Sequence, residues 1–156
     1  MHCASARRRS GCRRKPPGRA PCPVWTTSPQ RNSATSRLKV SGCSFSRGKS
    51  GIFSLTNSPC KEEDSAFLSL EKGIVARQMG TDSSISRCSF ENDGTGILAV
   101  QFCAVEIADC RFRENVTALD VQEFSTPKIH HNRFEANQAA VNLFRKSHAA
   151  IEHNLF

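Results

Sequence analysis

From residue 38 onward, apolar side chains recur along the chain at a fixed interval of 22 residues. Four isoleucines keep this interval: Ile85, Ile107, Ile129 and Ile151. A second series consists of phenylalanines and keeps the interval with one step of 23: Phe45, Phe67, Phe90, Phe112, Phe134 and Phe156. Self-similarity at a period of about 20–50 residues is the sequence signature of a repeat architecture such as a solenoid.

Two further positions follow the same interval. Six residues after each of the first five phenylalanines stands a small residue: Gly51, Gly73, Gly96, Ala118 and Ala140. Two residues before each phenylalanine stands a Cys, Ser or Asn: Cys43, Ser65, Cys88, Cys110, Asn132 and Asn154. The chain has only ten Phe and seven Ile, so the agreement of these registers over five or six copies indicates a genuine repeat.

The residues inside one repeat predict strands rather than helices. Leu119 and Val121 alternate with Asp120 and Gln122, which is the period-two pattern of a strand with one buried face. Tetratricopeptide, ankyrin and HEAT repeats are longer and helical, a leucine-rich repeat carries its own signature, and hexapeptide helices advance in multiples of six. The repeat therefore predicts a parallel β-helix, in which identical positions of successive coils stack on one another.

The repeat motif resembles that of a known family. Residues Ile129 to Asn137 follow the pattern I-x-x-N-x-F-x-x-N, which is similar to the right-handed parallel β-helix repeats of pectate-lyase-like proteins, NosD-type periplasmic proteins, and carbohydrate-binding and sugar-hydrolase modules. The resemblance implies an all-β, right-handed parallel β-helix (solenoid) of about five 22-residue coils over residues 38–156. The chain departs from the family pattern where cysteine replaces the ladder asparagine: Cys43, Cys88 and Cys110.

Residues 1–37 differ in composition from the rest of the chain. They hold nine Lys or Arg and no acidic residue, are rich in Pro and Ser, and show no apolar periodicity. This composition predicts a disordered basic N-terminal arm, because it offers too little apolar surface to offset the entropy of ordering. The arm is interpreted as a solvated tail, as the product of a start codon upstream of the true one, or as a tail that touches nucleic acid or acidic surfaces.

Charge and hydropathy say little about partners or compartment. Residues 38–156 hold 13 basic and 14 acidic residues, so the net charge of +8 resides in the arm, and nucleic acid is not expected as a partner of the folded part. No run of about 18 apolar residues predicts a transmembrane helix, and the Arg-rich start lacks the apolar stretch of a signal peptide. The localisation is therefore undetermined, although the family resemblance implies a secreted or periplasmic protein.

The cysteines have two interpretations. The chain has eight Cys and no C-x-x-C pair, and the phased ones occupy an inward position. We expect buried free thiols there, because Cys without a disulfide is among the most buried residue types. A bridge between the stacked Cys88 and Cys110 is the alternative.

An outward face of the predicted strands carries a candidate ligand site. It consists of four side chains from two successive coils: Asp120, Gln122, Asn142 and Phe144. Amides can bind hydroxyl groups and an aromatic ring can pack against a pyranose, so the set resembles a sugar-binding face; an ordinary solvated sheet surface is the alternative. The equivalent outward position in earlier coils is apolar, and such a strip is usually covered by a loop, an arm or a partner: Phe53, Val75 and Leu98.

A candidate metal site lies at a predicted bend. Asp109, His131 and His153 share one register, and stacking would bring the two imidazoles within about 5 Å. A bridging metal, copper by analogy with the NosD-type proteins, is one interpretation, and local stacking and hydrogen bonding of bend residues is the other. Calcium is the other candidate ion. It is implied by the resemblance to lyases of this fold, which use acidic calcium ligands and an Arg or Lys base. Because a dedicated ligand spacing is absent, no cofactor is expected.

For function, the sequence favours a non-catalytic module that binds an extended ligand, with polysaccharide preferred over protein, along an outward strand face. This preference derives from the fold resemblance. One alternative is a polysaccharide lyase or glycoside hydrolase, or a fragment of one; hydrolysis uses two carboxylates about 5–9.5 Å apart, whereas Asp120 stands alone in the central register. The other alternative is a protein-interaction scaffold without a glycan ligand.

Phe156 is the inward phenylalanine of a coil that has only begun. A solenoid needs a polar cap on its last coil, since an open end offers unpaired N–H and C=O groups to another strand. We therefore expect either a β-helix truncated at its C-terminal end or end-to-end self-association.

Overall fold

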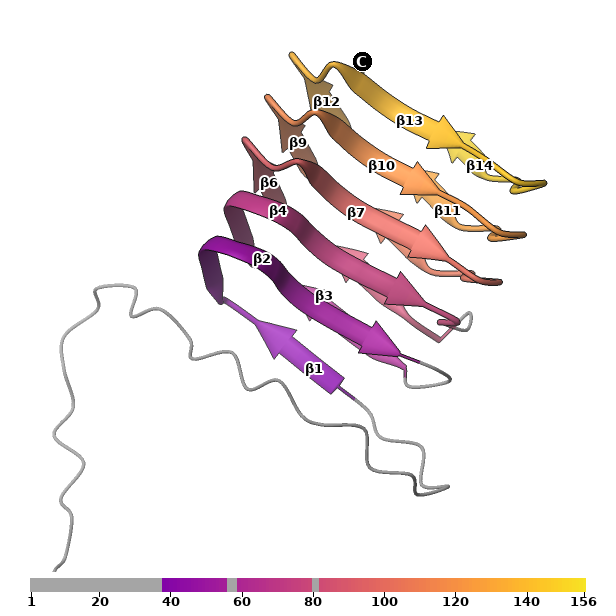
Figure 1. Cartoon of the computed structure of the whole chain (residues 1–156), viewed down its shortest axis with the longest axis horizontal. Coiled ribbons are helices and arrows are strands. Elements are labelled where there is room, and N and C mark those ends of the chain that lie inside the picture. The colour runs from indigo at the N-terminus through magenta and orange to yellow at the C-terminus, as the bar shows by residue number, and fades with distance from the viewer. Residues whose placement is uncertain (1–37, 56–58, 80–81) are drawn as a thin grey trace, which may run out of the picture.

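Residues 38–55, 59–79 and 82–156 are described in the computed structural model, and they form a parallel β-solenoid (Figure 1). Fourteen strands and no helix occur in these residues. The strands wind into about five coils with a spacing of about 22 residues, which confirms the predicted fold class. The predicted disordered arm, residues 1–37, lies outside the described residues.

The strands form three faces. The first face is a six-stranded parallel sheet: β1 (Leu38–Ser41), β3 (Cys60–Glu63), β5 (Ser84–Ser86), β8 (Glu106–Ala108), β11 (Lys128–His130) and β14 (Ala150–Glu152). The second and third faces share two long strands, which continue from one face to the other: β2 (Ser44–Leu55) and β4 (Ala66–Arg77). The second face also contains β6 (Ser89–Glu91), β9 (Arg111–Arg113) and β12 (Arg133–Glu135). The third face also contains β7 (Thr95–Val100), β10 (Thr117–Val121) and β13 (Ala139–Leu143).

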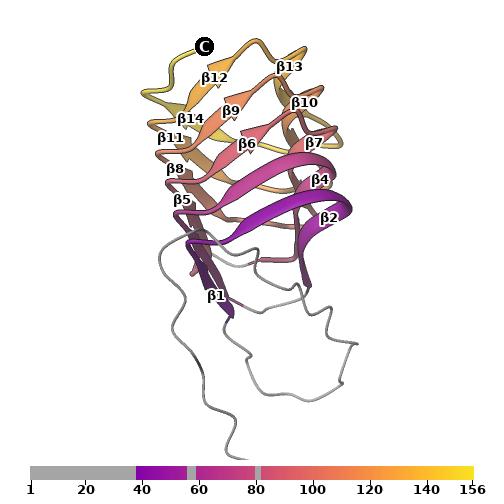
Figure 2. The ribbon, with the colours of Figure 1, turned by 90° about the vertical axis from the view of Figure 1, so that its left-hand side faces the viewer.

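Equivalent positions of neighbouring coils pair directly, as the repeat predicts. On the first face, Ile107 pairs with Ile85 on one side and with Ile129 on the other. On the second face, Phe90 pairs in the same way with Phe67 and Phe112. All these pairings are parallel, so the coils stack in chain order from one end of the solenoid to the other (Figure 2).

Stacked phenylalanines form the centre of the core. From Phe45 to Phe156, neighbouring rings of this series lie 4.7–5.0 Å apart and within 8° of parallel. The ring spacing matches the distance between adjacent strands, about 4.8 Å, so the backbone ladder itself sets the stack. Phe67, Phe90 and Phe112 are at most 1% exposed.

The small residue that follows each phenylalanine is explained by a close approach. A Cβ added to Gly51 would lie 2.7 Å from the Phe67 ring and 2.7 Å from the carbonyl oxygen of Gly73. The same crowding recurs at Gly73 and Gly96, one coil later each time. In the next two coils alanine occupies this position, and Ala118 is fully buried.

Polar ladders satisfy the backbone at two of the bends. At the bend between the first and second faces, the Asn132 Oδ1 accepts a hydrogen bond from the Cys110 N–H at 2.9 Å. The Asn154 Oδ1 accepts from the Asn132 N–H, also at 2.9 Å. Between the second and third faces, the Asn115 Oδ1 accepts a hydrogen bond from the Asp93 N–H in the same manner. The predicted asparagine ladder is therefore present, and each rung ties one coil to the next.

The first bend also needs a left-handed backbone. One residue in each coil there has φ between 52° and 56°, although none of them is glycine: Asp64, Arg87, Asp109, His131 and His153. In the first coil this position is Gly42, with φ of 66°. Because side chains in this region point away from the turn, the bend displays its charged and imidazole groups to solvent.

Glu62 interrupts the apolar interior. It pairs with Ile85 in the register of the isoleucines and is 0% exposed. Among the described residues, its carboxylate oxygens have no well-formed hydrogen bond, since the nearby Ser65 hydroxyl donates to the Glu63 carbonyl instead. Burial raises the Glu62 pKa to about 7, and it raises the Asp93 pKa to about 6.

A first prediction tests the core. Phe112→Ala should lower the free energy of unfolding by about 3–5 kcal/mol, because it leaves a cavity within the ring stack. The matched control, Phe144→Ala, removes the same ring from a position that is 52% exposed and should cost about 0.5 kcal/mol. Urea unfolding of both variants measures the difference, and equal losses would contradict the assignment of inward and outward positions.

A second prediction follows from Glu62. Its pKa rises from 4.5 in the unfolded chain to about 7 in the fold, so its contribution to stability is fully present below pH 4.5 and is lost by about pH 7. At about 1.4 kcal/mol per pKa unit, Glu62 alone should lower the free energy of unfolding by about 3 kcal/mol over that range, and Asp93, whose pKa rises from 3.8 to about 6, adds a loss that is complete by about pH 6. Glu62→Gln should remove the Glu62 part of this pH dependence and leave the Asp93 part in urea unfolding at pH 5 and 7.5. An unchanged slope in the variant would assign the effect to other groups.

Candidate functional site

The third face brings the four predicted ligand-site residues together. Asp120 of β10 pairs with Asn142 of β13, and the Phe144 N–H bonds to the Val121 carbonyl, which places Phe144 beside Gln122. The predicted apolar strip continues the same row toward the N-terminus, because Asp120 pairs with Leu98, Leu98 with Val75 and Val75 with Phe53.

The polar part of this face is already organised by its own contacts. The Gln122 Nε2 donates to the Asp120 Oδ2 at 2.7 Å, while the Asp120 Oδ1 is buried without a hydrogen-bond partner among the described residues. At the edge, the Arg145 Nη1 donates to the Glu123 Oε1 at 2.7 Å. These bonds hold Asp120 and Gln122 in place and leave one amide N–H of Gln122 for an external acceptor.

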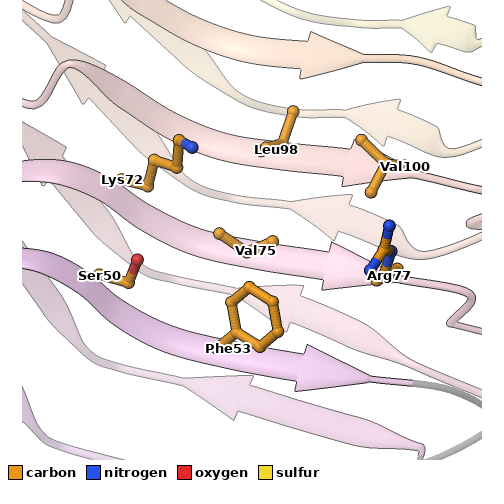
Figure 3. Close-up of a pocket in the computed structure, with 7 residues that line it drawn as sticks. All are labelled: Ser50, Phe53, Lys72, Val75, Arg77, Leu98 and Val100. Atoms are coloured by element: carbon orange, nitrogen blue, oxygen red, sulfur yellow. The ribbon is translucent and has the colours of Figure 1, made fainter.

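The apolar part of the face forms a shallow hollow. Its volume is about 260 Å³, and its lining comes from β2, β4 and β7: Ser50, Phe53, Lys72, Val75, Arg77, Leu98 and Val100. Figure 3 shows Lys72 and Arg77 at opposite ends of the hollow, with Phe53, Val75 and Leu98 between them. The hollow combines an apolar floor with two cationic ends.

The sequence pattern did not predict a role for two exposed aromatic residues beside this face, Phe102 and Phe124. Phe102 and Phe124 follow the third face, where the chain bends back toward the first, and their rings stack at 5.4 Å and 9°. They are 68% and 48% exposed, and the Lys146 Nζ continues the row 6.0 Å from the Phe124 centroid. Their 22-residue separation was the available signal, but they fit neither the inward series of six Phe nor the outward rows that hold Phe53 and Phe144.

The backbone at these two phenylalanines is unfavourable. Phe102 has φ of 59° and Phe124 has φ of 61°, and the residue before each is also left-handed. For a bulky side chain this conformation costs about 1–2 kcal/mol per residue. The same left-handed pair recurs one coil later at Arg145 and Lys146, so the bend imposes this conformation. Exposed phenylalanines on such a bend add little to the fold, and their presence there indicates a role at the surface. We call Phe102, Phe124 and the neighbouring Phe144 the aromatic edge.

The predicted metal residues are brought together only in part. His131 and His153 stack with ring centroids 5.3 Å apart and 12° between planes. The His131 Nδ1, however, faces the Nδ1 of His130 at 2.9 Å, and the His130 Nε2 bonds the Glu106 Oε1 at 2.9 Å. Asp109 occupies the equivalent bend position one coil earlier. No group of three or more His, Cys, Asp or Glu surrounds a common point in the described part of the chain.

Four buried cysteines of the described residues carry free thiols, and two of them, Cys88 and Cys110, are ones that the repeat placed inside the solenoid. Cys60, Cys88, Cys103 and Cys110 are each at most 2% exposed. Burial raises the Cys60 pKa to about 12 and holds the pKa of Cys110 well above its ordinary value. A hydrogen bond from the Cys110 thiol lowers the pKa of Cys88 instead. Because these four cysteines are buried, they are part of the core and do not form an exposed reactive site.

Comparison with known proteins identifies the fold. The family model described as a right-handed β-helix region matches residues 30–156. No curated protein and no solved structure matches the chain. Among the described residues, no helix has the length and hydropathy needed to cross a membrane.

A third prediction tests whether the aromatic edge supports the fold. Phe124→Asn should change the free energy of unfolding by no more than about 0.5 kcal/mol, because Asn tolerates the left-handed backbone and the ring is half exposed. Thermal or urea unfolding measures the change. A loss above about 2 kcal/mol would show that the ring has a structural role.

Proposed function

The chain belongs to the right-handed β-helix family, and on that premise we propose that it is a non-catalytic module that binds an extended ligand along its third face. The expected ligand is a polysaccharide. The observation that carries this proposal is the aromatic edge, whose phenylalanines are exposed and lie next to the polar side chains of Asp120, Gln122 and Asn142.

The chemistry of this surface matches a carbohydrate. The exposed ring of Phe124 or Phe144 can pack against the apolar C–H face of a sugar ring. The Asn142 and Gln122 amides lie within the same face and offer donors and acceptors to hydroxyl groups. Both kinds of contact therefore converge on one ligand.

The repetition of the surface favours a long ligand. Rows of outward residues run through β2, β4, β7, β10 and β13 with neighbours about 4.8 Å apart. A polymer with repeated units can contact several coils at once, and each added contact raises the total affinity. The hollow between Lys72 and Arg77 lies on the same face and extends this surface toward the N-terminal coils.

The carboxylates of this face support a binding role over hydrolysis. Along the outward rows of the third face in the described strands, Asp120 is the single carboxylate, and its Oδ2 accepts from Gln122. Glu123, at the edge, is engaged by Arg145. Glycoside hydrolysis uses two carboxylates flanking the scissile bond, and this pair of engaged groups lacks the free acid that protonates a leaving group.

A protein ligand is the second candidate, and the hollow favours it. Phe53 and the partly exposed Leu98 present apolar surface between two cations, whereas Val75, which also lines the hollow, is only 5% exposed. This surface suits an extended peptide that has an apolar side chain next to an acidic one. In that case the contacts would centre on β2, β4 and β7, away from the aromatic edge. Substitutions that weaken binding should therefore lie on β2, β4 and β7 for a protein ligand and at the aromatic edge for a polysaccharide.

A fourth prediction tests the carbohydrate proposal. In affinity electrophoresis against a panel of neutral and acidic polysaccharides, at least one should retard the wild-type chain. Phe124→Asn should weaken that binding by about tenfold, the loss expected for one aromatic contact worth about 1–1.5 kcal/mol. Glu91→Ala, on the second face, is the control and should bind like the wild type.

Three other outcomes are informative. Release of reducing ends from the bound polysaccharide would assign the chain to the polysaccharide lyases or glycoside hydrolases. Binding that Phe124→Asn leaves unchanged would move the site away from the aromatic edge. Failure of every polysaccharide, combined with capture of an acidic apolar peptide that Phe53→Ala abolishes, would favour the protein ligand.

A further inference from the structure

We infer that His130 and His131 bind one divalent transition-metal ion of tetragonal coordination, Cu(II) or Ni(II), and that Glu106 orients His130 for this role. The site lies at the bend between the first and second faces, directly after β11. It involves none of the residues of the proposed ligand face and does not depend on the proposed function.

The backbone creates the pair. Consecutive residues of a strand point to opposite sides, so two adjacent histidines would ordinarily have separated side chains. Here β11 ends at His130, and His131 has a left-handed φ of 56°. The turn brings the two Nδ1 atoms to 2.9 Å, with the rings nearly perpendicular. Two imidazole nitrogens therefore face one another at the surface.

Hydrogen bonds assign the tautomers of both rings. The Glu106 carboxylate can only accept, so the His130 Nε2 carries the proton and donates to it. The His130 Nδ1 then has a lone pair, and the His131 Nδ1 donates its proton into it. A metal ion replaces this shared proton, which moves to the exposed Nε2 of His131 through solvent. Both Nδ1 atoms become ligands, and neither ring changes its net charge.

The nitrogen separation selects the type of ion. With metal–nitrogen bonds of about 2.0–2.1 Å, two nitrogens 2.9 Å apart subtend an angle of about 90° at the ion. That is the angle between neighbouring ligands in square-planar or octahedral coordination, which Cu(II) and Ni(II) prefer. A tetrahedral Zn(II) would require about 3.3 Å at the same bond lengths. The exposed His131 ring can turn to direct its lone pair at the ion, and water fills the remaining positions.

The surroundings favour a cation. Glu106 holds His130 from the far side of its ring, the arrangement that commonly orients metal-binding histidines. Glu152 pairs with His130 in the neighbouring strand and adds a second negative charge. His153 stacks on His131, but its ring lies parallel to that of His131 and does not converge on the same point.

The experiment is a Ni(II) titration of the untagged full chain at pH 7.5, followed by calorimetry; Ni(II) is chosen because it does not oxidise the thiols. His130→Ala and His131→Ala should each remove one bound ion relative to the wild type. Glu106→Ala should weaken that ion's binding by about tenfold, the loss typical of an outer carboxylate. His148→Ala and His153→Ala are matched histidine controls and should keep it.

Three results would overturn the inference. The first is an equal number of bound ions in the wild type, His130→Ala and His131→Ala. The second is loss of the ion in His153→Ala with retention in His130→Ala, which would place the site in the stacked pair. The third is Zn(II) binding as tight as Ni(II) binding, which would contradict the tetragonal geometry.

Discussion

The structure depends on the parallel pairing of equivalent positions in successive coils. Backbone hydrogen bonds set the spacing between coils, and the phenylalanine rings stack at the same spacing, 4.7–5.0 Å. A ring that fits on one coil therefore fits on the next, and the same holds for Ile107 and its neighbours. One constraint thus explains the repeat, the dry interior and the straight rows of outward residues.

The exceptions to this pattern are as informative as its regularity. Glu62 occupies an isoleucine position inside the solenoid, and burial raises its pKa to about 7. Phe102 and Phe124 stack like the core rings but lie outside, on a left-handed backbone. The first lowers stability as the pH rises, and the second displays apolar rings to solvent. Neither the buried carboxylate nor the exposed rings stabilise the fold, so both point to a role other than stability.

The two candidate sites use the repeat differently. The ligand face is additive, because each coil contributes one residue to each outward row, and Asp120 meets Asn142 only because both obey the register. The histidine pair is local, because a single left-handed residue turns His131 toward His130. A long polymer suits the first arrangement and a single ion suits the second.

The sequence by itself determined the solenoid, its 22-residue coil, the inward Phe and Ile and the pairing of Asp120 with Asn142, because stacking makes the residue at one position reappear one coil later. The contact between the His130 and His131 nitrogens, the engagement of Gln122 with Asp120 and the outward turn of Phe102 and Phe124 were decided only in the tertiary structure. These features depend on bend dihedrals and side-chain rotamers. A repeat period constrains which residues become neighbours, but it does not constrain the direction in which a bend side chain points.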